Sequence, residues 1–111
     1  MPDTVLLMRQ PYKGDTMAIV HDTFTVGTTA TLIATIPEGN PTTTVAVVND
    51  DNSSIFIGDS TISVSGANKG LTVVKSTNYR IDLNAGDKLY AISSAGTSAN
   101  AVTILYSTVT R

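Results

Sequence analysis

The chain has 111 residues, no cysteine and a formal net charge of −2 at pH 7. Its length fits a single domain. The missing cysteines exclude disulfides and thiolate metal sites, and without a basic excess there is no electrostatic footprint for nucleic acid. Charged residues make up 14% of the sequence, against about 25% in ordinary soluble domains. So little charge protects a free monomer poorly against association, and we therefore expect part of the surface to be covered.

Residues 1–22 are predicted to form an extended N-terminal arm, and residues 23–111 a β domain. The apolar run of the arm, residues 5–8, is four residues long, whereas about 18 are needed to span a bilayer. No basic segment precedes it, as one would in a signal peptide. We therefore expect cytosolic synthesis and no membrane partner. The residues of the arm predicted to bind a partner are Val5, Leu6, Leu7, Met8, Arg9 and Tyr12.

Alternation of apolar and polar residues with a period of two marks strands in the β domain. It is present in residues 31–36, 61–65, 79–84 and 102–107, and the 79–84 segment has the clearest solvent-facing side. Clusters of Pro, Gly, Asn and Asp separate these segments, as turns require. No window keeps a helical period. The pattern predicts an all-β fold, an antiparallel β-sandwich or jelly-roll-like barrel of about eight strands.

Three segments are apolar on nearly both faces: residues 45–48, 55–57 and 71–74. A two-sheet domain has only one interior, so some of these side chains should emerge on the outside. Apolar strands with little charge are prone to aggregate unless they are covered. We favour a subunit or partner interface, and the alternative is that the arm or a loop covers them within one chain. The residues predicted for this interface are Val45, Val47, Ile55, Phe56 and Ile57.

Candidate metal ligands are few. His21 is the only histidine, so no histidine cluster exists, and we expect its imidazole to be solvated or bonded at an interface. Asp50, Asp51, Asn52 and Asp59 offer the oxygen ligands that calcium prefers, but their spacing matches no EF-hand loop. Because Asx residues favour turns through local hydrogen bonds, turn formation is the preferred interpretation, and we expect no metal.

Groups for catalysis are equally sparse. Glu38, Asp82 and Asp87 would be the carboxylates of a glycoside hydrolase, but the chain has no tryptophan to line a sugar cleft. Gly58, Gly66 and Gly70 match neither a P-loop nor a dinucleotide fingerprint. We therefore expect no enzyme activity and no cofactor. The four tyrosines are expected to pack in the core or at its rim rather than to stack on a carbohydrate: Tyr12, Tyr79, Tyr90 and Tyr106.

Five segments follow one another in a fixed order: VGTTATLI (26–33), VAVVN (45–49), SIFIGD (54–59), LNAGD (83–87) and LYAISSAGT (89–97). Their order and spacing resemble a family of small β-sandwich virion proteins of tailed bacteriophages, over residues 23–106. The family comprises head-decoration or cement proteins, head fibres and tail-fibre modules. The resemblance implies a structural virion protein without catalytic residues. The arm and residues 66–74 depart from the family pattern.

From this resemblance we expect a phage capsid decoration (cement) protein on the outer surface of the virion head. It would be made in the host cytoplasm, bind the major capsid protein and bridge capsomers. A ligand that binds only the assembled shell stabilises it by mass action. A homotrimer is expected to bury the strands that are apolar on both faces. The alternative is a receptor-binding or tail-fibre adhesion module that uses the loops at residues 37–41 and 49–52.

Overall fold

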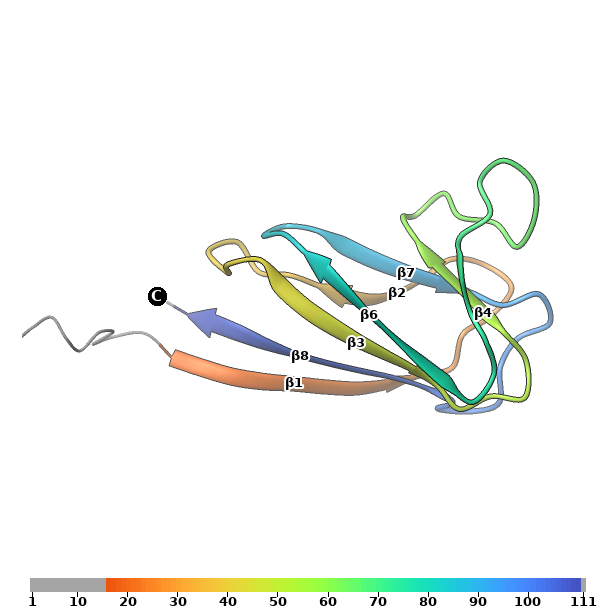
Figure 1. Cartoon of the computed structure of the whole chain (residues 1–111), viewed down its shortest axis with the longest axis horizontal. Helices are drawn as coiled ribbons and strands as arrows, with labels where there is room; N and C mark the ends of the chain where they lie inside the picture. Colours follow the sequence, from red (N-terminus) through yellow and green to blue (C-terminus); the bar gives the residue numbers. More distant parts are fainter. Residues whose placement is uncertain (1–15, 111) are drawn as a thin grey trace, which may run out of the picture.

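The computed structural model describes residues 16–110, which form eight β-strands and no helix. Two four-stranded sheets pack face to face (Figure 1). Sheet A has the strand order β1-β8-β3-β6 and sheet B the order β2-β7-β4-β5. The strands are β1 (Thr16–Phe24), β2 (Thr31–Thr35), β3 (Thr43–Asn49), β4 (Ile55–Gly58), β5 (Leu71–Val73), β6 (Thr77–Leu83), β7 (Lys88–Ile92) and β8 (Val102–Thr110). The predicted antiparallel β-sandwich is confirmed.

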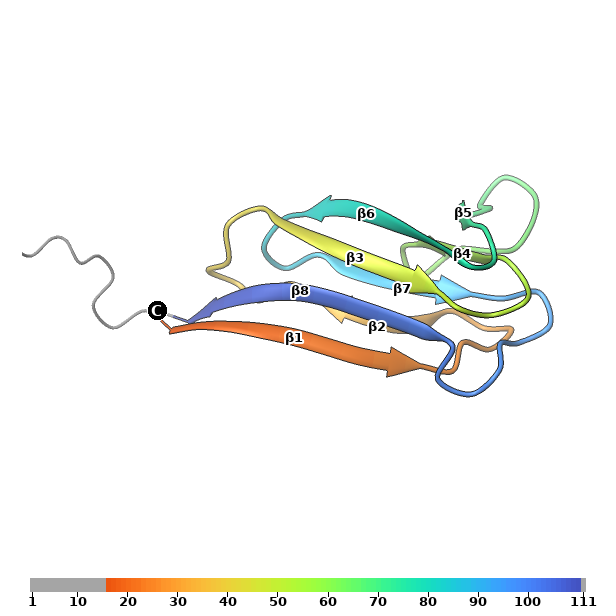
Figure 2. The ribbon, with the colours of Figure 1, turned by 60° about the horizontal axis from the view of Figure 1, so that its bottom comes forward.

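The connections between strands follow the order of a jelly roll. All pairings between the eight strands are antiparallel, and consecutive strands lie in different sheets except β4 and β5, which are neighbours in sheet B. An eight-strand double sheet with this order consists of two Greek keys. Most of the pairings therefore join segments far apart in the chain. The first and last strands, β1 and β8, lie side by side (Figure 2).

One core lies between the two sheets and takes alternate side chains from each strand. In β3, Val45 and Val47 are fully buried, and in β4, Ile55 and Ile57 are buried in the same way. The prediction that these four residues contact a partner is therefore wrong, because each strand turns one of its two apolar faces inward. The apolar side chains that reach the outer surface are those of the intervening residues, Ala46 and Val48 in β3 and Phe56 in β4.

The predicted boundary between arm and domain at residue 22 is also wrong. β1 begins at Thr16 and pairs with β8 in continuous register, from Thr16 opposite Thr110 to Phe24 opposite Val102. Nine residues of β1 therefore belong to sheet A, and Val20 and Phe24 pack against the core. This pairing satisfies backbone groups that the segment would otherwise expose. The other partner-binding residues predicted in the arm lie outside the described residues: Val5, Leu6, Leu7, Met8, Arg9 and Tyr12.

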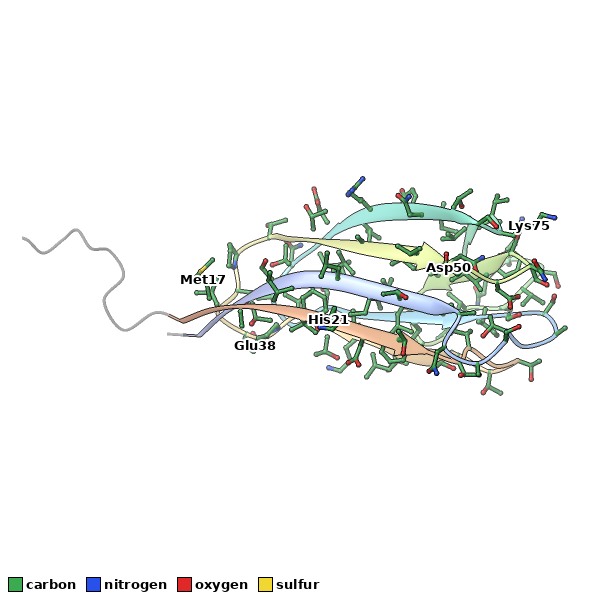
Figure 3. The ribbon with its side chains drawn as sticks, turned by 90° about the horizontal axis from the view of Figure 1, so that it is seen from below. Met17, His21, Glu38, Asp50 and Lys75 are labelled. Atoms are coloured by element: carbon green, nitrogen blue, oxygen red, sulfur yellow. The ribbon has the colours of Figure 1, made fainter. Side chains whose placement is uncertain are left out.

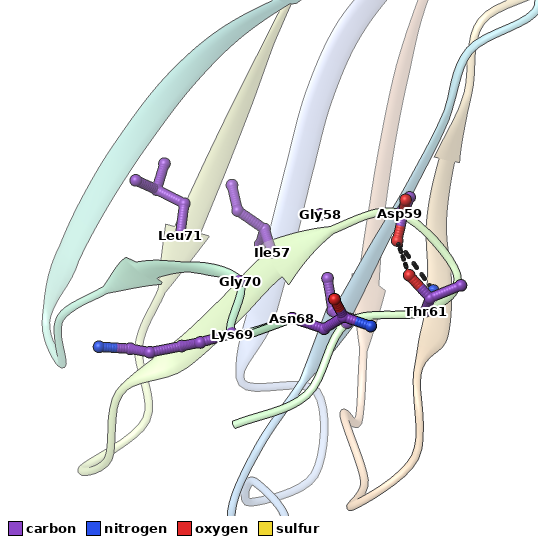
Figure 4. A pocket seen from close by; sticks show the side chains of 9 residues that line it. Ile57, Gly58, Asp59, Thr61, Asn68, Lys69, Gly70 and Leu71 are labelled. Atoms are coloured by element: carbon purple, nitrogen blue, oxygen red, sulfur yellow. Dashed lines mark hydrogen bonds between the residues drawn. The ribbon is translucent and has the colours of Figure 1, made fainter. Parts of the chain in front are cut away.

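The predicted strand at residues 61–65 is instead part of a loop that folds onto β4 (Figure 4). An isolated bridge between Ser63 and Lys69 holds the loop together. Two glycines allow the close approach. A Cβ atom on Gly70 would lie 2.6 Å from the carbonyl oxygen of Ile57, and one on Gly58 would overlap the side chain of Ile62.

We expect Gly70→Ala to lower the free energy of unfolding by about 1–3 kcal/mol, the usual cost of overpacking. The new methyl group would meet the backbone of β4, which cannot move aside as a flexible side chain can. Urea denaturation of wild-type and variant protein measures the difference.

Gly27→Ala is the matched control, because a Cβ at Gly27 has nothing within 4 Å. It should leave stability unchanged or raise it by less than about 1 kcal/mol through the unfolded state. Equal losses in the two variants would contradict the role assigned to Gly70.

Candidate functional site

The candidate ligands and carboxylates predicted from the sequence are spread over several strands and turns of the described residues. Within residues 16–110, no three His, Asp or Glu side chains are placed to hold a metal ion. His21 lies exposed on the outer face of sheet A (Figure 3). Two of the predicted carboxylates accept hydrogen bonds within the chain: Asp82 from the hydroxyl of Thr44 on the neighbouring strand at 2.6 Å, and Asp87 from the backbone N–H of Asn84 at 2.7 Å.

The acidic residues between 50 and 59 act as turn formers. The Asp51 carboxylate is buried and accepts hydrogen bonds from the backbone N–H groups of Ser98 (2.8 Å) and Ser53 (3.1 Å). These bonds, led by the one from Ser98, lower the pKa of Asp51. The Asp59 carboxylate accepts bonds from the hydroxyl and N–H of Thr61, and the hydroxyl bond contributes most to its lowered pKa. Asp59 borders an open hollow of about 290 Å³ (Figure 4).

Hydrogen bonds also connect the loops at the end of the sandwich opposite Thr16, where β1 begins. The amide and carbonyl of Val26 bond the hydroxyl and amide of Thr97, at 2.9 and 2.8 Å. The backbone of Asp50 bonds Ala101 at 2.8 Å. The fully buried side chain of Asn49 donates to the carbonyls of Ser53 and Val73. Polar groups in these loops are therefore directed largely at their own chain.

The outer face of sheet A carries the most prominent exposed apolar surface. Met17 and Ile19 of β1 are each 70% exposed, and Leu105 of β8 is 48% exposed. The register places all three on the side away from the core, because their neighbours in sequence, Val20 and Ile104, face inward. Half-buried apolar side chains of β3 and β8 continue this surface. We call the set the apolar face: Met17, Ile19, Ala46, Val48, Leu105 and Val109.

Polar side chains border the apolar face along β6 and β3. Arg80 lies opposite Ala46, and Asp82 lies opposite Thr44. A hollow of about 250 Å³ is lined by Arg80, Ala46 and Thr44 together with Ile19 and Leu105. An apolar centre with a polar rim is the usual anatomy of a protein interface.

The shape of the apolar face depends on Asn40. Pairing between β3 and β8 stops at Ala46 and Leu105, and the strands diverge beyond that point. There the buried Asn40 side chain donates to the Ser107 carbonyl at 3.1 Å and accepts from the Val109 N–H at 2.8 Å. The Asn40 side chain therefore bonds the β8 backbone where β3 no longer pairs with it. The hollow that results, about 270 Å³, extends to Met17.

None of the predicted contact residues that the structure describes lies on the apolar face. Phe56 is half-buried on the outer side of sheet B, where the Lys69 ammonium lies 5.8 Å from its ring centre. Sequence reasoning missed Met17, Ile19 and Leu105. The available signals were the apolar run at residues 17–20 and the presence of a leucine among the otherwise polar members of the 102–107 alternation.

Comparison with known proteins gives information on the fold only. No protein-family model and no curated protein matches the chain. A solved structure of Bacillus endospore appendages, described as a novel family of disulfide-linked pili, contains a chain with a similar fold. The TM-score is 0.57 at 11% sequence identity, over 85% of this chain and 87% of that chain.

In the part of the chain that the structure describes, no helix is long and apolar enough to cross a membrane.

The lowered pKa of Asp51 predicts an acid-sensitive contribution to stability. Because the folded-state pKa lies below the usual value of 3.8, the unfolded state binds more protons in this range. The contribution is present above the unfolded pKa and is lost as the pH falls through the folded pKa. We expect Asp51→Asn to lower the melting temperature near neutral pH and to flatten its decline between about pH 5 and pH 3.

Thermal unfolding followed by circular dichroism across this pH range measures the effect. Asp50→Asn, at the exposed neighbouring position, should keep the wild-type slope. Parallel curves for wild type and Asp51→Asn would contradict the assignment.

Proposed function

We propose that the protein is a head-decoration (cement) protein of a tailed bacteriophage, which binds the major capsid protein and bridges neighbouring capsomers. The observation that carries the proposal is the apolar face, which a surrounding assembly would cover. The succession of sequence segments that resembles phage virion β-sandwiches supports the same class of protein. In this proposal the apolar face is the surface that meets the shell.

The energetics of the apolar face suit a ligand that occupies many equivalent sites. Burying a large apolar side chain is worth about 1.5–3 kcal/mol, and the exposed fractions available for this gain are 70% for Met17 and Ile19 and 48% for Leu105. The cost of association offsets part of it. Moderate affinity at each site is sufficient, because binding only to the assembled shell stabilises the shell by mass action.

The tail-fibre or receptor-binding alternative has less support. It would use the loops at residues 37–41 and 49–52 for recognition. The polar side chains Asn40, Asn49 and Asp51 in these loops are buried and bond groups of their own chain. Glu38, Asp50 and Asn52 are the exposed charged or amide side chains that these loops leave for recognition of a glycan.

A second candidate is a subunit of an extracellular fibre. The fold likeness to a chain of the Bacillus endospore pili, with a TM-score of 0.57, favours it. Those pili are described as disulfide-linked, whereas this chain has no cysteine. A fibre of this protein would therefore depend on non-covalent contacts, with the apolar face between copies.

Binding to undecorated mature phage capsids tests the first proposal. Purified protein is mixed with capsids, and the bound copies per shell are counted after sedimentation. We expect saturable binding at a symmetry-related stoichiometry. Leu105→Glu and Ile19→Glu should each weaken binding at least about tenfold, which corresponds to a loss of about 1.4 kcal/mol.

Val74→Glu is the matched control, because Val74 is also an exposed apolar residue, at 52%, and lies outside the apolar face. It should bind as wild type does. Failure of wild-type protein to bind capsids would overturn the proposal. Binding to host cells would then favour the adhesion module, and polymerisation of the purified protein would favour the fibre.

A further inference from the structure

β1 is the most exposed site for strand pairing in the described structure. The two sheets have four edge strands, β1 and β6 in sheet A and β2 and β5 in sheet B. Natural sheets discourage pairing at edges with bulges, very short strands or charges. β2 has a register shift between Leu32 and Ala34, β5 has three residues, and β6 carries Arg80 and Asp82.

β1 carries little of this protection. It is nine residues long, contains neither proline nor lysine nor arginine, and runs in unbroken register with β8. Its acidic side chain is Asp22. A long edge strand of this kind, with five apolar residues among its nine, is a template for another strand.

An apolar groove runs beside the same edge. It lies between β1 and β2, the adjacent edges of the two sheets, and has a volume of about 250 Å³. Val20, Asp22 and Phe24 line it from β1, and Leu32, which is 41% exposed, lines it from β2. Val20 and Phe24 pack on the core but are only half-buried. The sandwich is therefore incompletely covered on this side.

We propose that β1 of a second copy of this chain pairs with β1 in antiparallel orientation, about a twofold axis at Val20. This register places Val20 opposite Val20 of the second copy, Ala18 opposite Asp22, and Met17 opposite Thr23. All nine residues of each strand are then paired. The two copies share one continuous eight-stranded sheet, and the second copy covers the groove beside β1.

The sequence of β1 is compatible with pairing to itself in this register. His21 lies opposite Ile19 and Asp22 lies opposite Ala18, so no two like charges are directly opposed. The two Asp22 carboxylates stand four positions apart along the strands, which is about 13 Å. That separation exceeds the Debye length of about 8 Å at physiological ionic strength. Shifting the register by one step of two residues would instead place His21 opposite His21 or leave Phe24 unpaired.

The proposed pair would present two apolar faces on one side of the joined sheet, because directly opposed residues in an antiparallel pair share a face. Two faces bound to one surface would act at a high effective concentration and strengthen binding. The pairing itself does not require a shell, so it goes beyond the proposed function and is tested separately. It replaces the trimer expected from the sequence with a twofold unit.

Engineered disulfides test the register, and the absence of native cysteine makes the readout clean. Directly opposed residues have Cα atoms about 4.5–5.5 Å apart, within the range of about 4.4–6.8 Å that a disulfide accepts. We expect mild oxidation of full-length Val20→Cys to yield mostly covalent dimers, separated on a non-reducing gel and reversed by reductant. Wild-type protein should sediment as a dimer at the same concentration.

Ala18→Cys and Asp22→Cys are the matched controls, since each residue lies four positions from its own copy in this register. Each alone should remain monomeric on the gel, whereas a mixture of the two should form the cross-linked heterodimer. This mixed pair also tests the register independently of any change at Val20.

Three results would overturn the proposal. The first is a wild-type monomer or trimer with no linkage through Val20→Cys. The second is equal linkage through Val20→Cys and Ala18→Cys, which indicates random collision. The third is linkage of Val20→Cys to a cysteine placed at Leu6 but not to itself, which would assign the edge to a neighbour's N-terminal segment.

Discussion

The antiparallel pairing of β1 with β8 is the interaction on which the rest of the structure depends. It extends sheet A from three strands to four and brings the first and last strands of the domain together. The same register places Met17 and Ile19 beside Leu105 and Val109 on the outer side of the sheet. It also leaves the opposite side of β1 as a sheet edge. The surface proposed to bind the shell and the edge proposed for self-pairing therefore both result from the pairing of β1 with β8.

Buried polar side chains complete the sandwich where strands cannot. Asn40 bonds the backbone of β8 beyond the point where β3 and β8 diverge, and Asn49 and Asp51 tie the loops at the far end. Buried polar groups are tolerated when they are hydrogen-bonded and costly when they are not. Here they supply the partners that the open ends of the sheets lack. The loops are thereby held to the domain, and the main surface left for a partner is a sheet face.

Low charge and missing cysteine have a joint consequence for assembly. Contacts between copies cannot be covalent through sulfur, and few charges oppose association. Apolar burial and backbone pairing at a strand edge are the remaining sources of affinity. The apolar face offers apolar surface for burial, and the edge of β1 offers backbone groups for pairing. Both belong to the pair of strands β1 and β8.

The sequence by itself determined the fold class. Alternation in residues 79–84 and 102–107 and the spacing of turn residues were enough to predict a sandwich of about eight strands, because a period of two is a local property of the chain. Only the tertiary structure decided which side of each apolar strand is buried. Val45 and Ala46 are both apolar, as are Ile57 and Phe56, and packing against the other sheet decides which residue of each pair faces inward. The strand at residues 16–24 was missed for the same physical reason. Its partner β8 lies some eighty residues away along the chain, so neither its pairing nor the face and edge that depend on it can be derived from local periodicity.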